Sequence, residues 1–253
     1  MYKSDANIQL SINNKIATLT FFHSASNSFT SQMLANLTAQ FNDLSSNELV
    51  NVIVLQSTGE GAFCAGASFN ELLSITDFES GTQFFSGFAN VINAMRKCDK
   101  IIIGRIHGKA VGGGVGLAAA CDFTIATAQS SIKLSEIAIG IGPFVIEPAV
   151  SRKIGKMACA TLTFTPSEWQ TASWAHQKGL FDKIVSSQTA LDIEVNQIAE
   201  QFITYNSTAL SQIKRIFWEN TDDWDTLLTD RAKISGQLVL SDFTKKALHE
   251  FKK

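Results

Sequence analysis

Hydrophobic and polar residues alternate in two short runs near the N-terminus. Residues 8–12 and 16–20 each place an apolar side chain at every second position, and Asn13-Asn14-Lys15 separates the two runs. An alternation of period two on both sides of a tight turn is typical of a β-hairpin that exposes one face to water. The sequence therefore predicts a hairpin over residues 8–20.

The segments that follow switch between helical and buried-strand patterns. Apolar residues recur at helical spacing over residues 31–44 and 82–98, whereas residues 50–55, 101–106 and 123–126 are near-continuous apolar strands. Such strands are usually covered on both faces, and their alternation with helices indicates a βαβ architecture. We therefore predict an α/β fold with ligand sites in the loops that follow the strands, at residues 59–68 and 112–116.

Beyond residue 144 the pattern becomes mainly helical. Amphipathic segments cover residues 188–205, 207–219 and 224–239, and one short strand is expected at 180–185. The last segment, 243–253, contains Lys245, Lys246, Lys252 and Lys253. We interpret it as a solvated helix end, where cations interact favourably with the helix dipole. Contact with a phosphate is the alternative. The length favours one large domain with an appendage.

Composition and charge exclude several classes of protein. The 253 residues include 21 Lys and Arg against 23 Asp and Glu, a net charge of −2, which argues against binding to nucleic acid. Charged residues interrupt the apolar stretch from 101 to 126, so we do not expect a membrane span. We expect reduced cysteines, no metal site, no secretory signal and a cytoplasmic location.

Two glycine-containing loops present backbone amides after buried strands. Residues 112–116 read Gly-Gly-Gly-Val-Gly and open a helix of small residues, and residues 59–69 form a second loop before another helix. Glycine permits close approach of a ligand, and a helix N-terminus favours negative charge. If the loops converge, one amide from each would hold an enolate-like oxygen. A tight structural turn is the alternative for 112–116.

Glu136 is the strongest acid/base candidate, because apolar neighbours raise the pKa of a lone carboxyl group toward neutrality. A surface glutamate in a loop is the alternative. Glu147 fits better as a carboxylate at a helix start, and Asp122 as a turn or packing carboxylate. No histidine lies in a nucleophile pattern, and Cys64 has no charged neighbour that would favour a thiolate.

Taken in this order, the loops resemble those of the crotonase superfamily, which includes enoyl-CoA hydratases and enoyl-CoA isomerases. Residues 62–67 are similar to its coenzyme A loop, and residues 108–114 followed by Cys121-Asp122 are similar to its oxyanion turn and the next strand. The resemblance covers nearly the whole chain. It implies a core of ββα turns over residues 1–190 and a helical region over 191–253 that builds homotrimers or dimers of trimers.

The resemblance also implies roles for individual residues. The amides of Ala67 and Gly113 would form the oxyanion hole for a thioester carbonyl, and Glu136 matches a catalytic carboxylate of the superfamily. Further positions expected to contact an acyl-CoA substrate are Ala65, Gly66, Ser68, Gly112, Gly116, Pro143 and Phe144. The variable wall of the acyl pocket would include Phe69, Leu72, Leu73, Phe84 and Phe88. No cofactor is implied beyond the coenzyme A of the substrate.

The chain departs from the superfamily pattern at three of these positions. Gly116 stands where two-glutamate hydratases carry their first glutamate, Ser68 replaces a common aspartate, and Gly61 replaces the usual lysine. The segment 140–148, which reads Gly-Ile-Gly-Pro-Phe-Val-Ile-Glu-Pro, is similar to a branch often assigned to methylglutaconyl-CoA hydration.

Three hypotheses follow for the function. The resemblance favours addition of water to a 2-enoyl-CoA with Glu136 as acid/base. Gly116 would then leave a slow hydratase unless another group, for which Glu147 is the candidate, supplies the second role. The alternative is migration of a double bond from C3 to C2, which requires only Glu136 to move a proton from C2 to C4. The third hypothesis is a non-catalytic acyl-CoA binding protein, in which Gly116 indicates that catalytic activity has been lost.

Overall fold

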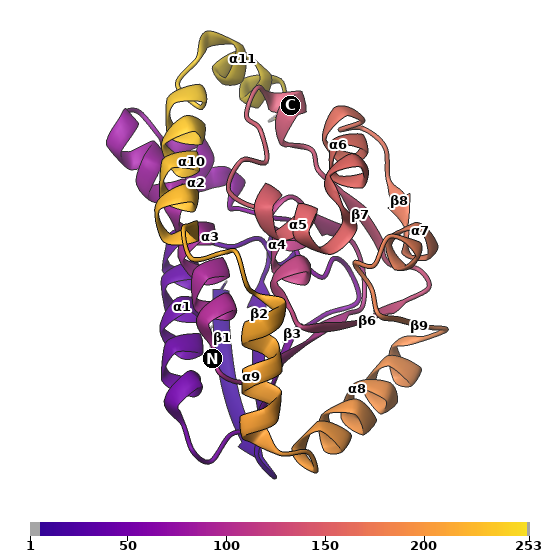
Figure 1. The fold of residues 1–253 in the computed structure, drawn as a ribbon. Helices are drawn as coiled ribbons and strands as arrows, with labels where there is room; N and C mark the ends of the chain where they lie inside the picture. The colour runs from indigo at the N-terminus through magenta and orange to yellow at the C-terminus, as the bar shows by residue number, and fades with distance from the viewer. Residues whose placement is uncertain (1–5, 252–253) are drawn as a thin grey trace, which may run out of the picture.

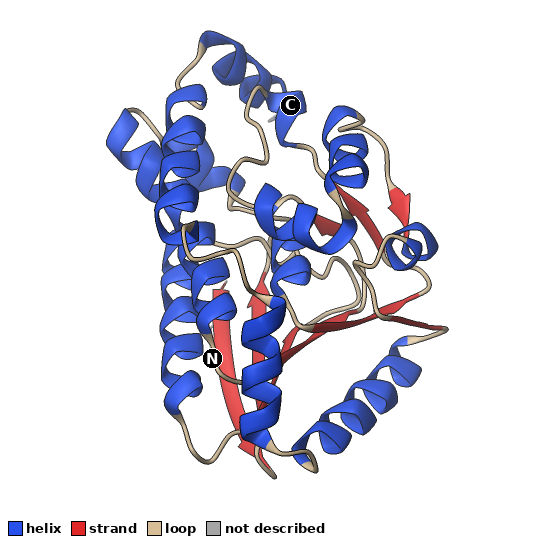
Figure 2. Cartoon of the chain, viewed as in Figure 1, coloured by secondary structure: helices blue, strands red, loops and turns tan. Residues whose placement is uncertain are grey.

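The computed structural model describes residues 6–251, which form two β-sheets and the helices around them (Figures 1 and 2). The larger sheet has the order β1-β2-β3-β4-β6-β9, and only its first pair is antiparallel. Its strands are β1 (Ala6–Asn13), β2 (Ile16–His23), β3 (Val52–Ser57), β4 (Ile101–Ile106), β6 (Phe123–Thr127) and β9 (Lys183–Val185). The smaller sheet contains β5 (Ala110–Val111), β7 (Ser131–Lys133) and β8 (Gln170–Thr171). The predicted hairpin is confirmed.

The chain winds in turns that visit both sheets before each helix. β3 leads through β-bridges at Cys64 and Ala67 to the helices α2 and α3, and β4 leads through β5 to α4. β6 leads through β7 to the short 3-10 helix η1. The helices of this part are α1 (Ser31–Ser46), α2 (Phe69–Ser74), α3 (Phe78–Lys97), α4 (Gly113–Ala120) and η1 (Glu136–Ile139). The expected α/β class with ββα turns is confirmed.

The second half is mainly helical, as the sequence predicts. Its helices are α5 (Glu147–Ile154), α6 (Lys156–Phe164), α7 (Ala172–Gln177), α8 (Gln188–Ile203), α9 (Ser207–Phe217), α10 (Trp224–Leu238) and α11 (Asp242–Phe251). The proposed boundary at residue 190 falls within α8, and that boundary and the oligomerisation role stay predictions. Lys252 and Lys253 lie outside the described residues. Among residues 6–251, no helix has the length and apolar character needed to cross a membrane.

Several predicted boundaries differ from the structure, and the starts of two elements differ most. α3 begins at Phe78 instead of residue 82, because the Asp77 carboxylate accepts a hydrogen bond from the Ser80 amide at 2.8 Å and caps the helix. β9 begins at Lys183 instead of residue 180, because the Leu180 amide donates a hydrogen bond to the Ala175 carbonyl of α7 at 2.9 Å and the pairing with β6 starts only at Lys183.

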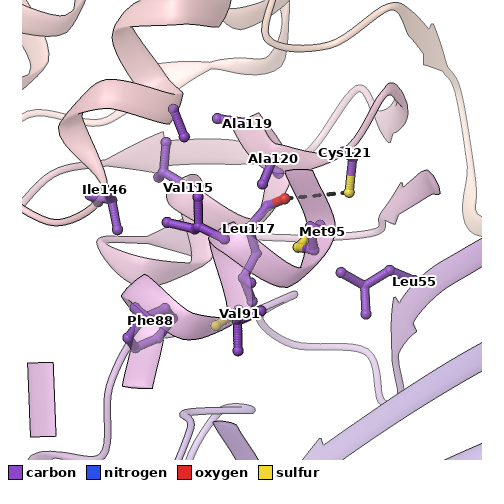
Figure 3. Packing of buried hydrophobic residues seen from close by; sticks show 14 of the residues in the cluster. Leu55, Phe88, Val91, Met95, Val115, Leu117, Ala119, Ala120, Cys121 and Ile146 are labelled. Atoms are coloured by element: carbon purple, nitrogen blue, oxygen red, sulfur yellow. Dashed lines mark hydrogen bonds between the residues drawn. The ribbon is translucent and has the colours of Figure 1, made fainter. Parts of the chain in front are cut away.

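Apolar side chains cover both faces of β3, which explains its near-continuous hydrophobic pattern. Ile53 and Leu55 belong to the cluster that includes α1, α3 and α4, whereas Val52 and Val54 pack with residues of α8. Figure 3 shows part of the larger cluster, in which Val115 of α4 is drawn with residues of α3. Burial of α4 in this cluster holds the glycine turn at its N-terminus in place.

Candidate active site

The two glycine-containing loops lie side by side, an arrangement that the residue pattern leaves open and the family resemblance implies. Cys64 and Ala110 form a parallel β-bridge, in which the Val111 amide donates a hydrogen bond to the Cys64 carbonyl at 2.9 Å. A Cβ on Gly66 would lie 3.0 Å from the Val111 carbonyl oxygen and 3.5 Å from the Gly113 nitrogen. Gly66 also has a φ of +88°, so this close approach requires glycine.

The amides of Ala67 and Gly113 are available to a ligand. On either side of Ala67, the Phe29 amide donates to the Gly66 carbonyl at 2.8 Å and the Ser68 amide donates to the Phe29 carbonyl at 2.7 Å. Neither the Ala67 nor the Gly113 amide has a hydrogen-bond acceptor within the part of the chain that the structure describes. Because Gly113 begins α4, its amide also carries the positive end of the helix dipole.

Ala67 and Gly113 both line a largely apolar pocket of about 170 Å³. Its aromatic wall consists of Phe69, Phe84, Phe85, Phe88 and Phe144. Leu72 also lines the pocket, whereas Leu73, predicted for the same wall, lines a different hollow beside α11. Four of the five residues that the family resemblance assigned to the variable wall, Phe69, Leu72, Phe84 and Phe88, therefore line this pocket, and their contact with an acyl chain stays a prediction.

Glu136 is the only ionisable side chain among the described residues that line this pocket. Its carboxylate lies against the backbone of Gly112, where a Cβ would come within 2.6 Å of Oε1. Its Oε2 is buried without a hydrogen-bond partner, although the residue as a whole is partly exposed. Burial raises the pKa of Glu136 from 4.5 to about 7, against the lowering effect of nearby backbone amides. Both protonation states are therefore populated near neutral pH.

Ile146 occupies the space next to Gly116 where a first glutamate would project. A Cβ on Gly116 would lie 2.6 Å from Cγ2 of Ile146, so the two positions are packed together. Glu147 does not line the pocket, because its carboxylate pairs with Arg231 and accepts a hydrogen bond from the Ser151 hydroxyl. The structure thus does not bring Glu147 to the place that the hydration hypothesis requires.

The structure brings most of the predicted substrate contacts together. The lining includes the following predicted residues: Ala65, Gly66, Ala67, Gly112, Gly113, Glu136, Pro143 and Phe144. Ser68 and Gly116 are not among the lining residues. The Ser68 hydroxyl instead accepts a hydrogen bond from the Glu71 amide at the start of α2. The catalytic and binding roles of all these residues stay predictions.

Sequence reasoning missed two kinds of pocket residue. Phe85 directly follows Phe84 on α3 and could have been found from that position. Ile146 and Ser235 carry no local signal, because Ser235 enters the wall only through the packing of α10 against α3.

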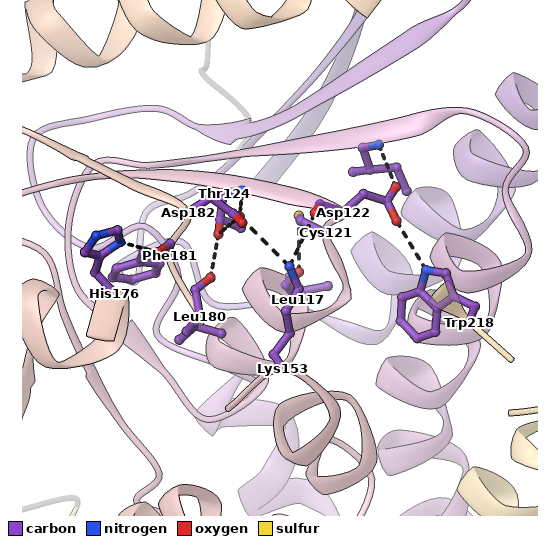
Figure 4. Close-up of polar contacts among 11 residues, drawn as sticks. Leu117, Cys121, Asp122, Thr124, Lys153, His176, Leu180, Phe181, Asp182 and Trp218 are labelled. Carbon is purple, nitrogen blue, oxygen red and sulfur yellow. Dashed lines mark hydrogen bonds and ion pairs between the residues drawn. The ribbon is translucent and has the colours of Figure 1, made fainter. Parts of the chain in front are cut away.

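Two other sequence candidates lie outside the pocket. Burial raises the pKa of the Cys64 thiol to about 12, so this group stays protonated at neutral pH, in line with the expectation. Asp122 has the predicted packing role, because its carboxylate accepts hydrogen bonds from the Ile102 amide at 2.8 Å and the Trp218 indole at 3.2 Å (Figure 4).

Comparisons with known proteins find one matching family and several similar proteins. The family described as enoyl-CoA hydratase/isomerase matches residues 11–252. A short-chain-enoyl-CoA hydratase of Clostridium acetobutylicum is 25% identical over 97% of this chain and 94% of its own length. An enoyl-CoA hydratase of Alternaria alternata is 30% identical over 66% of this chain, and the match spans about half, 54%, of that protein.

Solved structures show the same fold. A putative enoyl-CoA hydratase from Mycobacterium avium paratuberculosis superposes with a TM-score of 0.87 at 25% identity, covering 98% of this chain and 96% of the other. An enoyl-CoA hydratase from Bacillus halodurans gives a TM-score of 0.88 at 18% identity, covering 96% and 99%. The second similarity concerns the fold alone.

Proposed function

The chain belongs to the enoyl-CoA hydratase/isomerase family, and from that premise we propose that it moves the double bond of a 3-enoyl-CoA thioester to C2. The observation that carries the proposal is that Glu136 is the only ionisable group among the described residues of the pocket. Isomerisation requires one base, which removes a proton at C2 and returns it at C4. Water addition requires both an activated water at C3 and a proton delivered at C2.

The reaction uses the two loops and Glu136 in sequence. The thioester oxygen binds between the amides of Ala67 and Gly113, and Glu136 takes a proton from C2 to leave a dienolate. The negative charge gathers on the oxygen, where the two amides and the N-terminus of α4 stabilise it. Glu136 then returns the proton to C4. A pKa of about 7 suits both transfers, because neither proton loss nor proton uptake is strongly unfavourable.

The pocket favours a compact acyl chain without charge. Its volume of about 170 Å³ resembles that of an apolar cavity of about 150 Å³ that holds benzene. Its described lining contains no Lys, Arg or His. A free carboxylate, as in methylglutaconyl-CoA, would therefore be buried beside Glu136 without a cation to balance it. We do not extend the resemblance of segment 140–148 to that substrate.

Water addition is the second candidate, because the relatives described above are named enoyl-CoA hydratases. In this chain the reaction would rely on Glu136 alone. A second positioned acid or base contributes about a hundred- to ten-thousandfold in rate, so we expect hydration to be slow. Tight binding of acyl-CoA without turnover would indicate the third hypothesis, a binding protein.

Parallel initial rates on a short 3-enoyl-CoA and the matching 2-enoyl-CoA test the proposal. We expect isomerisation to exceed hydration by at least about a hundredfold, and Glu136→Gln to lower isomerisation by about a hundred- to ten-thousandfold. Glu147→Gln is the matched carboxylate control and should retain most of the activity. Hydration that is faster than isomerisation, or loss of activity in Glu147→Gln alone, would contradict the proposal.

A further inference from the structure

One hydroxyl group of the pocket wall has no hydrogen-bond partner. Ser235 of α10 lines the pocket and is only 1% exposed. Three other hydroxyl residues within helices, Ser86, Thr161 and Thr229, donate to the carbonyl four residues earlier, at 2.7, 3.0 and 2.8 Å. The Ser235 hydroxyl makes no such bond to the Arg231 carbonyl and no other hydrogen bond to the described residues. It is therefore available to a ligand in the pocket.

Ser235 lies well away from the oxyanion turn. α10 packs along α3 (Figure 1), and a Cβ on Gly236 would lie 2.6 Å from the Thr82 nitrogen, so Ser235 lies beside the first turns of α3. The Phe88 ring, by contrast, packs directly against Gly113. Thr82 precedes Phe88 by six residues, which is about 9 Å along a helix. The pocket therefore extends along α3 from the oxyanion turn toward Ser235.

The pocket wall offers no other polar side chain at this depth. Apart from Glu136, the described lining contains only two side chains that can form hydrogen bonds, Ser135 and Ser235. Ser135 directly precedes Glu136 and belongs to the reacting end. A plain alkyl chain would remove the Ser235 hydroxyl from water without giving it a partner, which is unfavourable. A chain that carries a hydroxyl group at this depth would satisfy it, because a hydroxyl both donates and accepts.

We propose that Ser235 selects a 3-enoyl chain with a hydroxyl group at its far end. The two hydroxyls form one hydrogen bond, and the rings of Phe84 and Phe85 line the path of the carbon chain between this bond and the reacting atoms. An extended six-carbon chain with a terminal hydroxyl spans roughly the 9 Å that separates the two ends. This inference rests on the proposed function for the thioester and its double bond, whereas the preference for a hydroxyl depends on Ser235.

Two substrates of equal size test the selectivity. A methyl group in 3-heptenoyl-CoA replaces the hydroxyl of 6-hydroxy-3-hexenoyl-CoA. We expect the wild type to use the hydroxylated substrate with a kcat/KM at least about fivefold higher, and Ser235→Ala, which leaves the substrate hydroxyl without a partner, to prefer the methyl substrate.

The control variant is Thr82→Val. It removes a second buried hydroxyl without a hydrogen-bond partner, beside Gly236 but outside the pocket lining, and should keep the wild-type preference. Equal use of the two substrates by the wild type, an unchanged preference in Ser235→Ala, or loss of the preference in Thr82→Val would overturn the proposal.

Saturated thioesters separate this inference from the proposed reaction. Neither 6-hydroxyhexanoyl-CoA nor heptanoyl-CoA can be isomerised, and calorimetry measures the Kd of each. We expect the wild type to bind the hydroxylated thioester at least about fivefold more tightly, and Ser235→Ala to lose this difference. If the difference depends on Ser235 but no 3-enoyl-CoA is isomerised, the proposed reaction fails and the selectivity stands. If both 3-enoyl substrates are isomerised alike and the saturated thioesters bind alike, the selectivity fails and the reaction stands.

Discussion

At the scale of single residues, the proposed isomerisation depends on the carboxylate of Glu136 and its burial. Glu136 must be deprotonated to take the C2 proton, and its pKa is about 7. We therefore expect kcat/KM for a 3-enoyl thioester to rise with pH through about 7 and to be roughly a hundredfold lower at pH 5 than at the plateau. A pH-rate profile checks this, and a flat profile between pH 5 and 8 would assign the proton transfer to another group.

The same burial makes Glu136 unfavourable for stability. Its pKa in the folded protein lies above the unfolded value of about 4.5, so between these values the folded state binds more protons and the free energy of unfolding falls as pH rises. Above pH 7, Glu136→Gln should raise the free energy of unfolding by roughly 3 kcal/mol relative to wild type, and at pH 4 the two should differ little. Urea unfolding at both pH values measures the difference, with Glu60→Gln, an exposed carboxylate, as control.

Ile146 packs directly against Gly116 and leaves no room for a side chain there. Gly116→Ala places a Cβ 2.6 Å from Ile146 Cγ2, and such overpacking costs about 1–3 kcal/mol of unfolding free energy. We expect Ile146→Ala in the same chain to relieve most of this strain, so that the double variant is more stable than the sum of the single variants predicts. Strict additivity in denaturant unfolding would show that Ile146 is not the obstacle at this position.

At the scale of elements, strong hydrophobic patterns predict which helices and strands exist better than they predict where each one begins and ends. The buried strands and the α1 helix follow from periodicity. The rule that ligand sites lie at the carboxyl ends of parallel strands selects the two glycine loops, but their convergence is implied only by the family resemblance. The start of α3 depends on one hydrogen bond that the Asp77 carboxylate accepts from the Ser80 amide, and periodicity does not contain this bond. The contribution of Ser235 to the pocket depends on how α10 crosses α3, and no local pattern predicts that crossing.

The crossing of α3 and α10 limits the pocket. Gly236 packs so closely that a Cβ would lie 2.6 Å from the Thr82 nitrogen. Gly236→Ala should move α10 away from α3, lower the free energy of unfolding by about 1–3 kcal/mol, and shift kcat/KM toward longer 3-enoyl chains as Ser235 leaves the wall. A chain-length series measures the shift. Gly61→Ala, where no atom lies within 4 Å of the added Cβ, should leave the preference unchanged.

At the scale of the whole molecule, a buried ion pair connects α9 to the residue that precedes β6. Lys214 of α9 is 2% exposed and its ammonium lies 2.8 Å from the Asp122 carboxylate, which also binds the Trp218 indole. Asp122→Asn leaves the buried ammonium without a counter-charge and should lower the free energy of unfolding by about 3–5 kcal/mol. Removing the exposed partner of Lys233 with Asp230→Asn should cost less than about 1 kcal/mol. Similar losses in the two variants would contradict the structural role of the pair.

The site as a whole joins segments that lie far apart in the chain. The loop before α2, the turn before α4, the residue that opens η1 and a serine of α10 meet in one pocket. Motifs in the sequence identify the first three because each has a chemical reason for its residues. The structure alone shows that Ile146 fills the space beside Gly116 and that Glu147 pairs with Arg231. Both observations favour isomerisation over hydration.

The most direct test of a one-carboxylate isomerase is the identity of its product. A short 3-enoyl-CoA is incubated with wild type and with Glu136→Gln in water labelled with ¹⁸O. After chromatography, the conjugated 2-enoyl product is distinguished from the substrate by its ultraviolet absorbance, and any hydrated product is identified by mass. We predict that the wild type forms the 2-enoyl isomer of unchanged mass and that Glu136→Gln forms almost none. A labelled 3-hydroxyacyl-CoA as the main product, or isomer formed by Glu136→Gln at the wild-type rate, would contradict the account.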